Sequence, residues 1–145
     1  MAALAAAALA AAGCGGGDDN KTLSYSDFSK QANDICKQAN DKNAGLNQKF
    51  TGKVETDAPL FDQLIPAIES ARSDFGDLKP HDELKADYDK FLSITDQQIA
   101  NAKKAQSQAK AGDQAGYIAT LKATQPLQEQ SNIEGSKLGA AECAK

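Results

Sequence analysis

Apolar side chains recur every three or four residues in four segments of this 145-residue chain. This is the period of an α-helix that buries one face, so it limits the fold to amphipathic helices packed against each other. The first predicted helix covers about residues 27–49, with Phe28 and Ile35 on its apolar face. Ser24 and Ser26 are candidate N-caps, because a serine oxygen accepts a hydrogen bond from a free amide of the first turn.

Three further helices follow, separated by glycine and proline. They are predicted over about residues 58–76, 80–111 and 114–138. Pro66 lies inside the second helix and predicts a kink or a break near Ile65, because proline has no amide hydrogen to donate. Pro126 is expected to bend the fourth helix in the same way.

The connections between these segments are short, which favours antiparallel neighbours. The fold class is therefore predicted to be all-α, an up-down antiparallel four-helix bundle. A long coiled-coil dimer is the alternative, but the prolines and the irregular apolar positions argue against it. Large apolar residues are few, with five Phe, three Tyr and no Trp. This supply suits a slender helical core.

The charge balance restricts the partners. The formal net charge is −4 at pH 7, and no long run of like charges occurs. A protein that binds nucleic acid needs a basic patch that displaces counterions, so we expect no nucleic-acid partner.

The first twelve residues are apolar and dominated by alanine. Twelve residues are too few to span a bilayer as a helix, but they match the apolar region of a signal peptide. Small residues then lead to Cys14, and residues 15–20, GGGDDN, have the composition of a flexible tether. An alanine-rich start with a chance cysteine is the alternative reading.

The stretch from Ala11 to Cys14 resembles the lipobox of bacterial lipoproteins. The resemblance implies that residues 1–13 are a signal peptide that is removed and that Cys14 becomes diacylated and N-terminal. Residues 14–23 would then be a lipid-anchored tether, and residues 24–145 the helical domain. The implied location is the extracytoplasmic face of the cell membrane. Ala11 stands where the family usually has leucine, and the usual basic residues of the signal peptide are missing. We therefore expect that the true start lies upstream.

The cysteine count completes this assignment. If Cys14 carries lipid, Cys36 and Cys143 remain, and an exported chain meets an oxidising compartment. In an up-down bundle the fourth helix ends near the start of the first, so we expect a Cys36–Cys143 disulfide. Closing a loop of roughly a hundred residues contributes about 4–5 kcal/mol in the chain-entropy model. Two free cysteines are the alternative.

Four stretches together resemble a group of small helical lipoproteins from high-GC Gram-positive bacteria. They are FSKQANDICKQAN, PHDELKADYDKFL, AKAGDQAGY and the terminal LGAAECAK. The resemblance covers about residues 24–145. It implies the helical fold and the crosslink, and it implies no activity.

The sequence contains few residues in patterns that indicate a catalytic site or a metal site. His81 is the sole histidine and follows Pro80 at a predicted helix start, where a solvated surface position is expected. One histidine makes neither a histidine-rich metal site nor a glutamate–histidine di-iron site. The carboxylates around Asp82 lack the calcium-loop pattern of an EF-hand and alternate with lysines. We expect no enzyme, no cofactor and no metal site.

Two functions remain open. The first is a membrane-anchored, non-enzymatic structural or protein-interaction module of the cell envelope. The second is a lipoprotein that binds a small ligand or metal ion, in a cleft where Pro66 and Pro126 bend the helices. Tyr88 and Tyr117 are the candidate cleft residues, because each has an aromatic ring with a polar tip. The main expectation for the aromatic residues on inner helix faces is the core, and the cleft is the alternative for the two tyrosines; these residues are Phe28, Phe61, Phe75, Tyr88, Phe91 and Tyr117.

Overall fold

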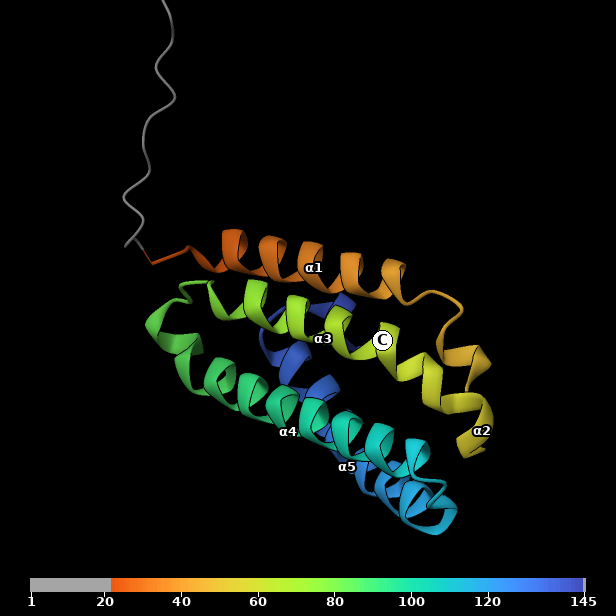
Figure 1. The fold of residues 1–145 in the computed structure, drawn as a ribbon. Coiled ribbons are helices and arrows are strands. Elements are labelled where there is room, and N and C mark those ends of the chain that lie inside the picture. Colours follow the sequence, from red (N-terminus) through yellow and green to blue (C-terminus); the bar gives the residue numbers. More distant parts are fainter. Residues whose placement is uncertain (1–21, 145) are drawn as a thin grey trace, which may run out of the picture.

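The computed structural model describes residues 22–144, which form an up-down bundle of four long helices (Figure 1). Residues 1–13 and Cys14, with most of the predicted tether, lie outside the described residues. The long helices are α1 (Tyr25–Lys42), α3 (Phe61–Gly76), α4 (Lys85–Lys110) and α5 (Gln114–Lys137). The short elements are α2 (Val54–Asp57) and the 3-10 turns η1 (Asn47–Lys49), η2 (Ala58–Leu60), η3 (Asp82–Leu84) and η4 (Ala141–Ala144).

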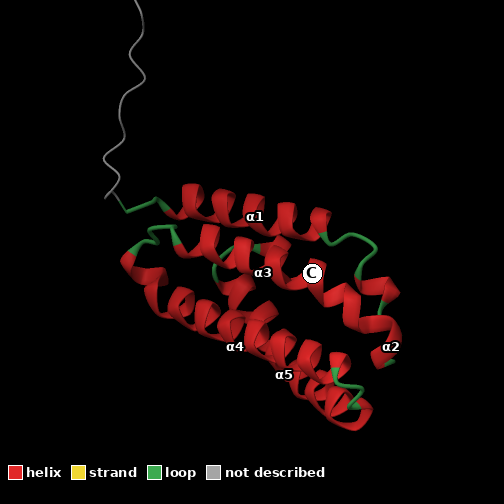
Figure 2. Ribbon diagram, viewed as in Figure 1, coloured by secondary structure: helices red, strands yellow, loops and turns green. Residues whose placement is uncertain are grey.

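Successive long helices run antiparallel, and residues 22–144 contain helices, turns and loops but no strand (Figure 2). The predicted all-α, four-helix architecture is confirmed for this part of the chain. None of the helices within it is both long and apolar enough to cross a bilayer.

Local chemistry explains several helix ends. The Ser24 hydroxyl accepts a hydrogen bond from the Asp27 amide at 3.1 Å and so caps α1. The Asp113 carboxylate caps α5 by accepting from the Gly116 amide at 2.9 Å. Gly112, with a φ of +73°, ends α4, because the left-handed backbone there is favourable only for glycine.

Two predicted boundaries are wrong. The first helix ends at Lys42 instead of about residue 49, because Gly45 takes a φ of +76° and turns the chain away. The third long helix begins at Lys85, after a 3-10 turn, and not at Pro80.

The predicted break near Ile65 does not occur. Helix α3 runs from Phe61 to Gly76 through Pro66. A proline in the second turn removes one hydrogen bond of the helix and leaves the others in place. Helix α5 likewise runs through Pro126 without interruption.

Three ion pairs join α3 to α4 along one edge of the bundle. They are Asp62–Lys110 at 2.9 Å, Glu69–Lys103 at 2.6 Å and Arg72–Asp96 at 2.7 Å. The numbers rise along α3 as they fall along α4, as an antiparallel pair requires. Because these pairs are largely solvent-exposed, they add little to the stability of the fold. They help to fix how α3 is aligned along α4.

The core is divided into two separate clusters. The Phe28 cluster lies where α1 begins and α3 ends, and the Tyr117 cluster lies where α3 and α5 begin. The Phe28 cluster comprises Phe28, Ala32, Phe75, Leu78, Leu84, Tyr88, Phe91, Leu138 and Ala140. The Tyr117 cluster comprises Val54, Phe61, Ile65, Ala105, Ala109 and Tyr117.

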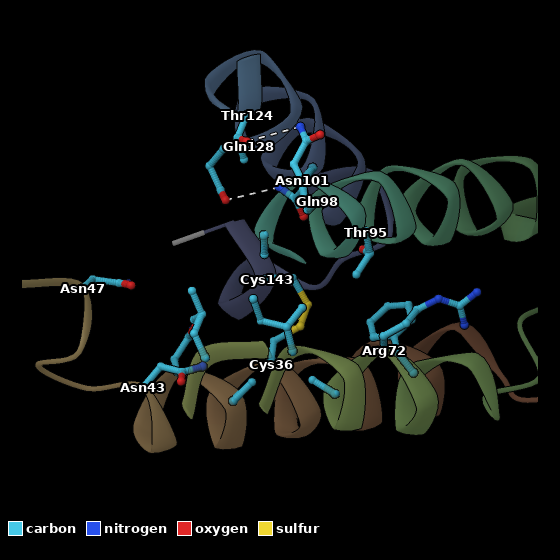
Figure 3. Close-up of a pocket in the computed structure, with 18 of the residues that line it drawn as sticks. Cys36, Asn43, Asn47, Arg72, Thr95, Gln98, Asn101, Thr124, Gln128 and Cys143 are labelled. Atoms are coloured by element: carbon cyan, nitrogen blue, oxygen red, sulfur yellow. Dashed lines mark hydrogen bonds between the residues drawn. A yellow bond between two sulfur atoms is a disulfide. The ribbon is translucent and has the colours of Figure 1, made fainter. Parts of the chain in front are cut away.

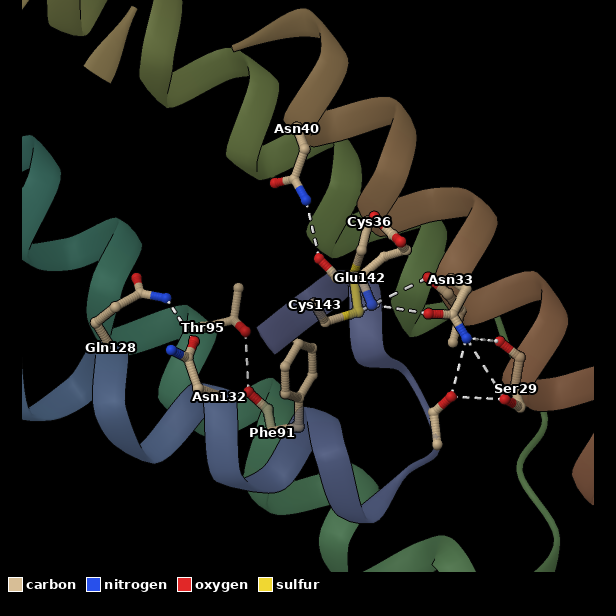
Figure 4. The surroundings of a disulfide bond; sticks show 12 residues. Ser29, Asn33, Cys36, Asn40, Phe91, Thr95, Gln128, Asn132, Glu142 and Cys143 are labelled. Carbon is tan, nitrogen blue, oxygen red and sulfur yellow. Dashed lines mark hydrogen bonds between the residues drawn. A yellow bond between two sulfur atoms is a disulfide. The ribbon is translucent and has the colours of Figure 1, made fainter. Parts of the chain in front are cut away.

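The disulfide predicted between Cys36 and Cys143 is present, and it closes a sequence separation of 107 residues. It fixes η4 against α1 (Figure 4). Asn33 adds to this attachment, since its side-chain amide donates to the Gly139 carbonyl at 2.9 Å and accepts from the Glu142 amide at 2.8 Å. The C-terminal turn thus fills the space between α1 and α5.

Candidate ligand-binding cleft

A cleft of about 870 Å³ lies between the α1–α3 layer and the α4–α5 layer (Figure 3). It occupies the middle of the bundle, between the Phe28 cluster and the Tyr117 cluster. Its volume falls in the upper part of the usual range for small-molecule sites. The lining residues are Ile35, Cys36, Ala39, Asn40, Asn43, Asn47, Phe50, Phe61, Leu64, Ile68, Ala71, Arg72, Phe75, Phe91, Leu92, Thr95, Gln98, Asn101, Ala102, Ala105, Leu121, Thr124, Gln125, Gln128, Ser131 and Cys143.

The wall contributed by α3 is almost entirely apolar. Leu64 and Ile68 face the cleft from α3, and Leu92 and Leu121 face it from the opposite layer. All four side chains are only partly buried. A packed bundle would bury such residues completely, so this apolar surface is available to a ligand.

The wall formed by α4 and α5 carries a polar seam. The Gln98 amide donates to the Gln128 side-chain oxygen at 3.3 Å, and the Asn101 amide donates to the Thr124 hydroxyl at 3.2 Å (Figure 3). Asn and Gln side chains hold both donors and acceptors, so each retains capacity after these bonds. The seam therefore offers neutral hydrogen-bonding groups opposite an apolar wall.

Four of the lining residues are exposed amides, and we call them the amide rim: Asn40, Asn47, Gln125 and Gln128. Two come from the α1 side and two from α5. Their exposure places the entrance of the cleft between these elements. The Asn40 amide also donates to the Glu142 carbonyl at 2.8 Å, which links the rim to the C-terminal turn (Figure 4).

Arg72 is the only charged residue among the described residues that line the cleft. Its guanidinium donates to both carboxylate oxygens of Asp96, at 2.7 and 3.0 Å. This hydrogen bonding, with the charge of Arg72, holds the pKa of Asp96 below its ordinary value. The two charges compensate each other, and the cleft is electrically neutral along its lining.

The disulfide forms part of the same wall, since both Cys36 and Cys143 line the cleft. The crosslink holds α1 at a fixed distance from the C-terminal turn. Cross-linked walls favour a cleft that exists before ligand arrives, which lowers the cost of ordering on binding.

The two tyrosines predicted for a cleft lie elsewhere. The Tyr88 hydroxyl is buried and contacts the carbonyls of Phe75, Gly76 and Leu78 at 2.9 to 3.1 Å. Burial raises the pKa of Tyr88. The side chain therefore belongs to the core, as mainly expected, where it stabilises the α3 C-terminus, and it does not line the cleft.

Tyr117 is completely buried, and its hydroxyl donates to Oδ2 of Asp57 at 2.7 Å. Burial and this hydrogen bond raise its pKa. Like Tyr88, it belongs to a core cluster and does not line the cleft. Aromatic rings at inner helix positions filled the core because their burial is more favourable than exposure at a cleft.

His81 is exposed at the start of η3, where its Nδ1 lies 3.5 Å from the Glu83 amide. Near it, Lys85 pairs with Asp89, and Lys137 lies 3.7 Å from Asp87. Within residues 22–144, no group of three or more histidine, cysteine and carboxylate side chains is placed to hold a metal ion. Several of the charges on this surface are therefore paired with each other.

The residues that line the cleft were missed as a site, although part of the pattern was visible. Thr95, Thr124 and Ser131 occupy inward-facing positions of α4 and α5 where a packed bundle would have apolar residues. Polar residues at the centre of two inner faces were the available indication. The separation of the two layers was not visible in the sequence.

We compared the chain with protein-family models, with curated proteins and with solved structures, and none of them matches it. The function therefore has to be inferred from the cleft itself.

Proposed function

We propose that this protein is a non-enzymatic, lipid-anchored binding protein of the extracytoplasmic membrane face that holds a small molecule in the cleft. The observation that supports this most is a neutral cleft of about 870 Å³ between two separate core clusters. Leaving apolar residues unpacked in the centre of the bundle lowers the stability of the fold. A ligand that fills the cleft would restore these contacts.

The membrane anchor in this proposal rests on the sequence around Cys14. A domain tethered at Cys14 would stay close to the membrane while its helices remained free to bind. This location also fits the disulfide, because an oxidising compartment preserves such a bond. No group with catalytic geometry enters the proposal.

A structural or protein-interaction module of the envelope is the second candidate. The large hydrophobic side chains that are exposed in the described residues are Tyr25 and Ile133, on different helices. Scattered apolar residues do not form a docking patch, so the surface supports a protein partner less than the cleft supports a ligand.

The test is a pair of alanine-to-phenylalanine substitutions on α4. Ala102 lines the cleft, and Ala100 is an exposed residue on the same helix. Fluorescence of N-phenyl-1-naphthylamine, a neutral apolar dye, reports occupancy of an apolar site. We expect the full chain carrying Cys14→Ser to bind the dye, A102F to bind it at least about tenfold more weakly through loss of cleft volume, and A100F to bind it normally. Equal dye binding by A102F and A100F would overturn the proposal, provided that their circular dichroism spectra match.

A further inference from the structure

The lining of the cleft carries information about its ligand. We infer that the ligand is an uncharged amphiphile, with a hydrocarbon chain between the two layers and a neutral hydroxyl- or carbonyl-bearing head at the amide rim. This inference rests on the proposed function, because it names the ligand class of the same cleft.

The hydrocarbon part follows from the interior. Leu64, Ile68, Leu92 and Leu121 expose part of their side chains to the cleft between the two clusters. Covering this surface with hydrocarbon removes apolar area from water on both partners, at about 25 cal/mol for each Å². A compact polar ligand would leave these side chains in contact with water. An elongated chain is the shape that covers all four.

The neutral head follows from the rim. Asn40, Asn47, Gln125 and Gln128 carry side-chain amides and no formal charge. Amides donate to and accept from hydroxyl and carbonyl oxygens, which matches a glyceryl, ester or alcohol head group. A carboxylate or ammonium group would find no opposite charge among the residues of this rim.

The one cation of the lining does not change this conclusion. Arg72 projects from α3, and its guanidinium is held by Asp96 through two hydrogen bonds. Asp96 already compensates the charge of Arg72 through this bidentate pair, so the attraction of Arg72 for an anionic ligand is weakened. The Arg72–Asp96 pair therefore disfavours an anionic group at that wall, and we expect the hydrocarbon chain of the ligand to lie beside it.

Three probes with the same C18 chain test the head group: 1-monooleoylglycerol, oleate and oleylamine, each below its micelle-forming concentration. We use the full chain carrying Cys14→Ser and measure displacement of N-phenyl-1-naphthylamine. We expect 1-monooleoylglycerol to displace the dye at concentrations about tenfold lower than either charged probe, because the rim offers hydrogen bonds to its hydroxyl groups and no opposite charge to the other two heads. Native mass spectrometry is expected to show one bound 1-monooleoylglycerol for each chain.

A charge placed at the rim provides a second test that does not depend on packing. Gln128 and Gln130 are both exposed on α5, but only Gln128 lines the cleft. We expect Gln128→Lys to strengthen oleate binding severalfold and to weaken oleylamine, because the new cation faces the head group. Gln130→Lys is expected to change neither.

The two possible failures are distinguishable. Equal displacement by the three probes, or tighter binding of a charged one, would overturn the inferred ligand class while leaving a binding cleft. An identical response to Gln128→Lys and Gln130→Lys would also overturn it. Absence of dye binding, or dye binding that A102F does not affect, would overturn the proposed function itself.

Discussion

The hydroxyl of Tyr117 donates a 2.7 Å hydrogen bond to the carboxylate of Asp57, and both side chains are completely buried. The same carboxylate accepts the backbone amides of Thr51 at 2.9 Å and Gly52 at 2.8 Å. Asp57 thus joins the loop after η1 to helix α5, sixty positions further along the chain. Its partner Tyr117 belongs to the Tyr117 cluster, whose Phe61 and Ala105 also line the cleft.

Removing the tyrosine hydroxyl isolates one of these bonds. Tyr117→Phe keeps the buried ring and leaves Asp57 with its backbone donors. We expect a loss of about 1.5–3 kcal/mol in the free energy of unfolding, the usual range for a hydrogen bond to a charged group. Urea denaturation followed by circular dichroism measures it, since the chain has no tryptophan to report by fluorescence. An unchanged free energy of unfolding would mean that the hydrogen bond between Tyr117 and Asp57 does not stabilise the fold.

Replacing the carboxylate is expected to cost more. In Asp57→Asn one of the two oxygens becomes an NH₂ group, and each oxygen faces a backbone amide donor. Donor would then face donor at a buried position, at a cost of about 2–4 kcal/mol. Asp74 is an exposed control on α3, and we expect Asp74→Asn to stay within about 0.5 kcal/mol of the wild type. Asp57→Asn with the stability of this control would contradict the proposed role.

The same carboxylate predicts an acid dependence of stability. Burial alone raises the pKa of Asp57, but the hydrogen bonds from Thr51, Tyr117, Gly52 and Thr56 together outweigh it and hold the pKa below the ordinary 3.8. A folded-state pKa below the unfolded value means that the ionised form stabilises the fold. This contribution is complete above pH 3.8 and is lost as the pH falls through the folded-state pKa.

The measurement compares unfolding free energies of the wild type and Asp57→Asn at about pH 7 and about pH 3. We expect the stability difference between them to be smaller at the lower pH, because protonation removes the wild-type advantage. A difference that stays constant between the two pH values would contradict the lowered pKa.

The disulfide is expected to supply a large part of the stability. Cys143→Ser opens the loop of 107 residues and should lower the free energy of unfolding by about 4–5 kcal/mol in the chain-entropy model. Cys36→Ser and the double variant should show the same loss, because each removes the same bond. With dithiothreitol present, wild type and variants should melt at similar temperatures. Two results would contradict this role: a wild type whose melting temperature dithiothreitol does not lower, and a Cys143→Ser variant as stable as the wild type.

Much of the fold could be predicted from the sequence. The spacing of residues such as Phe28 and Ala32 defines one buried face, and capping residues such as Ser24 mark where helices begin. These signals are local, so a single sequence contains them. The pairing of Cys36 with Cys143 was also accessible, because the up-down topology and an even number of remaining cysteines leave one choice.

The cleft could not be predicted in the same way. Whether two helical layers meet or stay apart depends on how all inner side chains fill the space between them, which is a property of the whole bundle. Tyr88 and Tyr117 illustrate the difficulty, because a ring with a polar hydroxyl suits a binding site as well as a core. A buried carbonyl holds Tyr88 in the core, and a buried carboxylate holds Tyr117 there. Inward-facing Thr124 and Ser131 were the better indication.

The lipid anchor is the remaining prediction, and it depends on one residue outside the described part of the chain. If Cys14 is diacylated, the protein expressed in a Gram-positive host should sediment with membranes and enter the detergent phase of Triton X-114. Its intact mass should show removal of residues 1–13 and addition of a diacylglyceryl group. Cys14→Ser should release the protein into the soluble fraction, whereas Gly16→Ser in the tether should not. A soluble wild-type protein that retains Met1 would contradict the anchor. The domain would then still hold its disulfide and its cleft, since both lie within residues 22–144.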